Sequence, residues 1–217
     1  MLKIKNLLLA IVVVLFTTSA MAQTFRIGIS GTGTKWDATG SETQSSDTET
    51  QEIGAIYGQV FGEVELQEYI SIGFSMMPYE IDSETATNTR NGGAQNSDSG
   101  TNTVQVDIQD YMMLYVMLEV PDTGVYLKVG RSTADLITNE SMGATSSKYG
   151  DATLDGTFGS IGYAYDTGYG VIVRAEVGVS EYDDISITGT GGDGTANTVT
   201  LTGMDGPTAG ISIVKEF

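Results

Sequence analysis

The sequence lacks histidine and cysteine entirely, and each absence excludes a class of chemistry. Without histidine, the commonest general base and the commonest transition-metal ligand are missing. Without cysteine, no disulfide, thiol redox centre or thiolate-bound metal can form. A serine–lysine or carboxylate-only mechanism is chemically open, but no spacing of residues supports one. We therefore expect no enzyme activity, no catalytic residues, no bound metal and no cofactor.

Basic residues are also scarce, because 10 Lys and Arg stand against 28 Asp and Glu, and the formal net charge is −18. This charge argues against a nucleic-acid partner, whose phosphates require lysine and arginine. After the first residues there is no apolar run long enough for a helical membrane span. Glycine, with 28 residues, and tyrosine, with 11, are abundant instead.

Residues 1–22 have the pattern of an export signal. Lys3 and Lys5 precede an unbroken apolar run at 7–16, and Ala20-Met21-Ala22 matches a cleavage site. The run is shorter than the roughly 20 residues that a helix needs to cross a bilayer, which argues against a signal anchor. The sequence thus predicts a signal peptide at 1–22, cleavage before Gln23, and a single mature domain at 23–217.

The mature sequence alternates between apolar and polar residues with a period of two, which is typical of half-buried β-strands. Clear examples lie at 25–30, 70–76, 104–109, 125–130 and 169–179. No helical pattern with capping residues follows residue 23. The sequence therefore predicts an all-β fold.

Short and long connections take turns between the expected strands. Tight turns are expected at 66–68, 121–124 and 166–168, and long polar loops at 31–51, 80–102, 132–153 and 189–197. Eight strands joined in this way predict an antiparallel, up-and-down transmembrane β-barrel, with its tight turns in the periplasm and its long loops outside. A soluble β-sandwich is the alternative, but it has no reason to sort its turns by length.

Aromatic residues gather beside the expected tight turns, where a barrel places a girdle of aromatic side chains at the level of the lipid headgroups. The candidates are Phe25, Phe61, Tyr69, Tyr115, Tyr126, Tyr165, Tyr169 and Phe217. The alternative is that they are core aromatics at strand ends.

The last expected strand, at 210–217, ends in Phe217, and Ile211 and Ile213 occupy alternate positions before it. It resembles the C-terminal strand of outer-membrane barrel proteins, from which only Lys215 departs. With the signal pattern and the eight strands, the mature chain resembles the OmpA/OmpX/OmpW-like group of small outer-membrane β-barrels. The resemblance implies a location in the bacterial outer membrane, contact with its lipid, and recognition by the barrel-assembly machinery through Ile211, Ile213 and Phe217.

If the apolar faces of the strands meet lipid, their polar faces point into the lumen. The inward set is then Arg26, Glu63, Glu65, Asp107, Gln109, Lys128, Arg174 and Glu176. By the same parity, Gly54, Gly58 and Gly62 face lipid. Side chains fill the interior of an eight-stranded barrel, and buried charges must pair, because an unpaired one costs several kcal/mol.

Counting residues from each tight turn places four of the inward charges at one level of the barrel. We predict a salt-bridge cluster of Lys128 and Arg174 with Glu176 and Glu63. The expected function is that of a structural or surface-interaction barrel, monomeric, with a side-chain-filled polar lumen and long acidic extracellular loops. The alternative is a narrow channel for small solutes.

Overall fold

The computed structural model describes residues 24–43, 48–83, 85–90, 100–141, 148–190 and 196–217. The expected signal peptide lies outside this range. Its strands are β1 (Phe25–Glu42), β2 (Thr48–Gln67), β3 (Ile70–Met76), β4 (Ile81–Asp82), β5 (Ala86–Arg90), β6 (Gly100–Glu119), β7 (Val125–Ser141), β8 (Ala152–Asp166), β9 (Val171–Tyr182), β10 (Ile185–Thr190) and β11 (Ala196–Glu216). Among these residues there is no helix of the length and apolarity that a membrane span requires.

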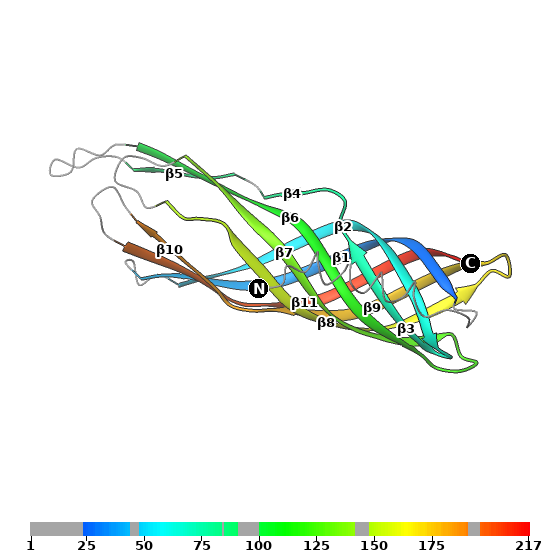
Figure 1. Cartoon of the computed structure of the whole chain (residues 1–217). Coiled ribbons are helices and arrows are strands. Elements are labelled where there is room, and N and C mark those ends of the chain that lie inside the picture. The colour runs from blue at the N-terminus through cyan, green and yellow to red at the C-terminus, as the bar shows by residue number, and fades with distance from the viewer. Residues whose placement is uncertain (1–23, 44–47, 84, 91–99, 142–147, 191–195) are drawn as a thin grey trace, which may run out of the picture.

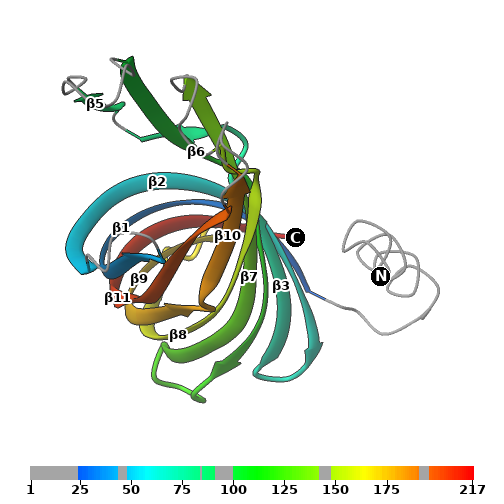
Figure 2. The ribbon, with the colours of Figure 1, turned by 90° about the vertical axis from the view of Figure 1, so that its left-hand side faces the viewer.

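All pairings in the sheet are antiparallel, and the pairing of β1 with β11 closes the sheet into a ring (Figures 1 and 2). β3, β4 and β5 follow one another along β6 and together form one interrupted strand of the ring. β9 and β10 follow one another along β11 in the same way, so the eleven segments form a ring of eight strands. The predicted eight-stranded, up-and-down β-barrel is therefore confirmed. Tight turns follow β2, β6 and β8 and define the turn end of the barrel, which is periplasmic in outer-membrane barrels; the opposite end is called the loop end.

The outward face near the turn end is apolar, as the alternation predicts. Val177, Val179 and Ile211 have exposed fractions of 59%, 64% and 64%, whereas Arg174 and Val214 on the opposite parity are buried. Strand β2 follows the same rule, because Ile56 is 88% exposed and Tyr57 is buried. Gly54, Gly58 and Gly62 therefore share the outward face, as predicted.

Towards the loop end this outward apolar band gives way to charge. Lys35 forms an exposed ion pair with Glu52, and Arg131 lies 3.7 Å from Asp183. Further acids occupy the same outward parity, namely Asp37, Asp155, Glu181 and Asp205. Since charges on the lipid face of a barrel are tolerated only near the interfaces, this belt marks the upper limit of the apolar band.

The long loops are shorter than predicted, because strands occupy most of the polar segments. β1 continues to Glu42 and β2 starts at Thr48, so strand fills most of the segment 31–51. Threonine has a high strand propensity and forms cross-strand pairs. Such pairs join Thr39 to Thr50 at 2.9 Å and Thr188 to Thr198 at 2.8 Å.

The predicted aromatic girdle is only partly correct. Tyr165, Tyr169 and Phe217 face outward, with exposed fractions of 62%, 86% and 70%, and so do Phe25 and Tyr69. The remaining three candidates, Phe61, Tyr115 and Tyr126, are buried in the lumen.

Glycines opposite these inward rings explain the correction. Tyr115 pairs with Gly73, and Tyr126 pairs with Gly162. A Cβ atom on either glycine would lie 2.2 Å from the tyrosine ring. The rings thus lie flat over glycine on the neighbouring strand, an arrangement that stabilises a curved sheet.

A bulge in β6 overturns two of the predicted lumen residues. Asp110 has a φ of 51°, and the register with β7 shifts between Gln109 and Met112. Beyond this extra residue the parity of β6 is reversed, as β-bulges cause. Ile108 consequently packs against buried apolar side chains inside the barrel, and Asp107 and Gln109 lie on the outward parity. Asp107 is nevertheless only 8% exposed, and it accepts a hydrogen bond from the Asn139 side chain on the same face.

Candidate functional site: the layered lumen

The four charged residues predicted to cluster lie together at the turn-end side of the lumen, and we call them the ionic layer. Arg174 on β9 donates to both carboxylate oxygens of Glu63 on β2, at 2.7 and 2.9 Å. Their side chains are 4% and 1% exposed. Two parallel N–H···O bonds of this kind form the strongest geometry for an ion pair.

Lys128 on β7 and Glu176 on β9 form the second pair of the ionic layer. The Lys128 Nζ atom lies 2.7 Å from one Glu176 carboxylate oxygen and 2.6 Å from the other. Two tyrosines complete the layer, because Tyr115 donates to Glu63 at 2.8 Å and Tyr126 donates to Glu176 at 3.0 Å.

The ionic layer fills the cross-section of the barrel at its level. The cavity beside Glu63, Lys128 and Arg174 measures about 20 Å³, which is room for about one water molecule. The cations also lie over aromatic rings, with Lys128 5.1 Å from the centre of Tyr115 and Arg174 5.6 Å from that of Tyr126. Two acids balance two bases, so neither sign is buried alone.

A second charged cluster, absent from the predicted site, lies nearer the turn end. Arg26 on β1 binds carboxylates from three other strands, at 3.2 Å to Glu65, 2.8 Å to Glu119 and 2.8 Å to Glu216. Strand parity places Arg26 and Glu65 inward, but only the closed ring brings β6 and β11 within reach of one guanidinium. The three carboxylates are about a third exposed, so this Arg26 cluster is open to water.

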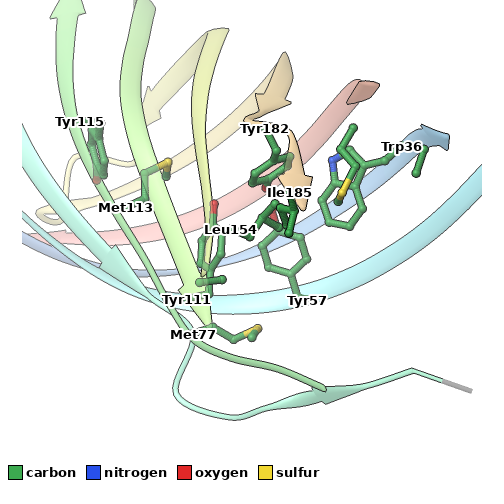
Figure 3. Close-up of a cluster of buried hydrophobic side chains, with 12 residues drawn as sticks. Trp36, Tyr57, Met77, Tyr111, Met113, Tyr115, Leu154, Tyr182 and Ile185 are labelled. Carbon is green, nitrogen blue, oxygen red and sulfur yellow. The ribbon is translucent and has the colours of Figure 1, made fainter. Parts of the chain in front are cut away.

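The loop-end half of the lumen is filled mainly by large apolar and aromatic side chains, with small polar ones such as Thr34, Ser132 and Ser180 between them, so the lumen is less polar than predicted. Its buried side chains, which we call the apolar layer, include Trp36, Tyr57, Met77, Tyr111, Ala134, Leu154, Tyr182, Ile185 and Met204 (Figure 3). Trp36 meets Tyr182 edge to face at 5.7 Å, and Tyr57 lies 5.8 Å from Tyr111. A cavity of about 20 Å³ remains among them.

The apolar layer was missed because several of its members lie in segments that were predicted as loops. Trp36 alternates with the charged residues Lys35 and Asp37, and this polarity hides the strand. The signal that could have revealed it is the inward parity of Thr32, Thr34, Trp36 and Ala38, all of them buried. Threonine or apolar residues at every second position form a strand pattern even where the outward face is charged.

The barrel wall has a seam beside the apolar layer. β3 pairs with β2 only from Val60 towards the turn end, and β4 and β5 pair with β6 instead. Residues 48–59 of β2 therefore have no strand partner on this side among the described elements. Figure 2 shows β5 and β6 diverging from β2 here. We use the word seam for the gap between residues 48–59 of β2 and residues 77–82.

The three residues of the expected assembly signal are on the outer surface. Ile211, Ile213 and Phe217 have exposed fractions of 64%, 53% and 70%. The Phe217 amide donates to the Phe25 carbonyl at 2.9 Å, so the last residue takes part in closing the ring. Their role in assembly stays a prediction. Within the described ranges, no group of three or more acidic side chains is placed to hold a metal ion.

No protein-family model and no curated protein sequence matches the chain. Among solved structures, OprG from Pseudomonas aeruginosa is similar with a TM-score of 0.55 and 11% identity, over 90% of this chain and 96% of that one. The outer-membrane protease OmpT from Escherichia coli has a TM-score of 0.49 and 8% identity, over 93% and 100% of the two chains. Ail of Yersinia pestis has a TM-score of 0.43 and 9% identity, over 91% and 100%.

The likeness to OprG shows the fold, and a fold by itself does not imply an activity. The closed ring, the tight turns at one end and the outward apolar band are independent features of this chain that agree with it. The protein has the fold and the lipid-facing surface of a small β-barrel of the bacterial outer membrane.

Proposed function

We propose that this barrel passes small apolar molecules from the outside into the membrane through the side of its wall. The observation that carries the proposal is the position of the apolar layer, whose Tyr57 and Met77 lie at the seam. An apolar site beside an unpaired stretch of wall favours lateral exit over passage along the barrel axis.

The lumen is blocked between the apolar layer and the turn end, which supports the lateral route. Below the apolar layer, the Arg174–Glu63 and Lys128–Glu176 pairs occupy the lumen and leave about 20 Å³. An apolar molecule that moved on towards the periplasm would have to separate these buried ion pairs, which costs several kcal/mol.

The composition of the apolar layer supports entry from the loop end. Met77, Met113 and Met204 lie among its aromatic rings. Methionine side chains are unbranched and flexible, so they repack around ligands of different shapes. The layer is nearly filled in this state, and a molecule would enter it by displacing these side chains.

The depth of the seam supports release into lipid. Ile56 of β2 lies along the seam on the outward face, and Val60 lies at its turn-end limit; both are exposed, at 88% and 39%. They belong to the outward apolar band, below the charged belt at Glu52. A molecule that leaves the apolar layer through the seam therefore enters hydrocarbon.

Uptake of N-phenylnaphthylamine, an apolar dye that fluoresces in lipid, tests the proposal. Cells that produce the barrel should take up the dye faster than cells without it. Ala134→Phe fills the apolar layer, where Ala134 is 2% exposed, and should remove the gain. Ala175→Phe adds the same ring on the outward face of β9 and should keep it. Folding of each variant is checked by its faster gel migration when unheated.

A structural or surface-interaction barrel is the second candidate, and the filled lumen favours it. The ionic layer and the apolar layer each retain a cavity of only about 20 Å³. Equal dye uptake by cells with and without the folded barrel, both for the native barrel and for a variant whose seam is loosened, would support this candidate and reject lateral passage.

A further inference from the structure

The segment that closes the seam is not a strand. β3 ends at Met76, β4 begins at Ile81, and residues 77–80 lie between them in irregular structure. Pro78, in the middle of this segment, has no N–H group and so cannot extend a ladder. The segment therefore crosses the gap beside β2 without forming backbone pairs with it.

Met77 covers the seam from the inside. Its side chain is 4% exposed and packs in the apolar layer with Tyr57 and Tyr111 (Figure 3). Its amide donates to the Tyr111 carbonyl at 3.0 Å, which holds it to β6. The inner cover is thus fixed to the β6 side of the seam, while its contact with β2 is made by side chains alone.

Tyr79 covers the seam from the outside. Its hydroxyl accepts a hydrogen bond from the Gly58 amide, on the stretch of β2 that pairs with β1 but has no described strand partner on the seam side. The ring lies against the glycine, since a Cβ atom there would be 3.4 Å from the hydroxyl and 4.0 Å from a ring carbon. In hydrocarbon every backbone N–H needs a partner, and here a side chain supplies it.

We propose that Tyr79 is the latch of the seam, and that its release from Gly58 opens the lateral exit from the apolar layer. This inference rests on the proposed function and adds the residue that controls it. A strand ladder opens only when several backbone hydrogen bonds break together. This closure opens when one side-chain hydrogen bond breaks, the Tyr79 ring rotates and the flexible Met77 side chain moves aside. Tyr79 is 47% exposed, so the ring has free space on its outer side.

The test compares dye uptake by the native barrel, by Tyr79→Phe and by a cross-linked variant. Tyr79→Phe keeps the ring and removes the hydroxyl, so the open state should gain about fivefold, as expected for one hydrogen bond of ordinary strength, and uptake should rise accordingly. Tyr163→Phe, which removes a hydroxyl from an exposed ring on the outward face of β8, is the matched control and should leave uptake unchanged.

The cross-linked variant supplies the opposite perturbation. The chain has no cysteine of its own, so Gly58→Cys with Tyr79→Cys offers two unique thiols for a short bifunctional reagent. Cross-linking should reduce uptake to the level of cells without the barrel. Gly58→Cys treated with the same reagent should retain uptake, and Tyr79→Cys, which lacks the latch hydroxyl, should exceed the native level.

The outcomes separate the latch from the lateral route itself. If Ala134→Phe abolishes uptake but neither Tyr79→Phe nor the cross-link alters it, the route stands and the latch is wrong. If cells with the native barrel take up no more dye than cells without it, and Tyr79→Phe does not raise the uptake, both the lateral route and the latch are wrong. If only Tyr79→Phe takes up dye, the native seam is held shut by Tyr79, which supports the latch.

Discussion

At the scale of single residues, the most consequential contact is the ion pair of Arg174 with Glu63. Both side chains are almost wholly buried, and the carboxylate also accepts from Tyr115. Bringing two ions out of water costs several kcal/mol each, and their mutual attraction offsets this only while both are present. Removing one member of the pair should therefore lower the stability of the folded barrel more than removing both.

Glu63→Gln should destabilise the folded barrel by about 3–5 kcal/mol, because it leaves the Arg174 charge buried without a counter-charge. The joint replacement Glu63→Leu with Arg174→Met removes both charges and should be much milder. Unfolding by denaturant, followed in detergent micelles, measures both effects. A joint variant that is less stable than Glu63→Gln would contradict this account of the pair.

On the outer surface a charge has no counter-charge and is surrounded by hydrocarbon, so a single added charge is destabilising there. Val173 faces outward on β9, between Ile213 of β11 and Tyr165 of β8. Val173→Arg should destabilise the barrel by about 1–2 kcal/mol, because Val173 lies beside the outward ring of Tyr165, between the bilayer midplane, where arginine costs about 2–4 kcal/mol, and the interface, where it costs about 0–1 kcal/mol. Thr200→Arg, in the loop-end part of β11 opposite Ser186, should have a far smaller effect. Refolding into lipid vesicles provides the measurement, and equal losses would mean that Val173 does not face lipid.

At the scale of elements, the bulge in β6 decides which side chains form the apolar layer. Without the extra residue at Asp110, Ile108 would continue outward and Asp107 would enter the lumen. The alternation of apolar and polar residues shows which side chains point inward only as far as the next bulge. No residue type in 104–112 indicates that a bulge is present. The polar segments predicted as loops resemble strands whose outward faces lie in water, and only a surviving inward parity, as at Thr32, Thr34, Trp36 and Ala38, distinguishes them in the sequence. Only their partners, in particular the threonine pairs, show that they are paired.

Asp110 makes the bulge testable. Its φ of 51° lies in the left-handed region, which aspartate and asparagine tolerate and β-branched residues do not. Asp110→Val should destabilise the barrel by about 1–2 kcal/mol, the penalty for this conformation, whereas Asp110→Asn should remain close to the native protein. Thermal unfolding in micelles compares the two. A valine variant as stable as the asparagine variant would show that the bulge relaxes at no cost.

At the scale of the whole molecule, strand number, order of turns and turn-end parity follow from the sequence, since each is a local pattern repeated around the ring. The ionic layer could be predicted for the same reason, because its four residues lie near tight turns, and the number of residues from a turn gives each one's level in the barrel. The Arg26 cluster and the seam could not be predicted from the sequence, since both depend on which strands become neighbours when the ring closes. Arg26 contacts Glu119 on β6 and Glu216 on β11, the strand that pairs with β1 when the ring closes. The seam exists because β4 pairs with β6 and leaves residues 48–59 of β2 without a second strand partner among the described elements.

The layered lumen implies that two closures act in series along the barrel axis. The ionic layer and the apolar layer are each filled to within about 20 Å³, whereas the Arg26 cluster is partly open to water. The native barrel should therefore be silent in planar bilayers. Lys128→Ala with Glu176→Ala opens the ionic layer without changing its net charge, and Tyr57→Ala with Tyr111→Ala opens the apolar layer. Each pair alone should remain silent, because the other layer still excludes water, and only the four replacements together should conduct. Conductance of the native barrel would reject both closures and favour an axial channel. Conductance of one pair alone would place the whole closure in the layer which that pair removes.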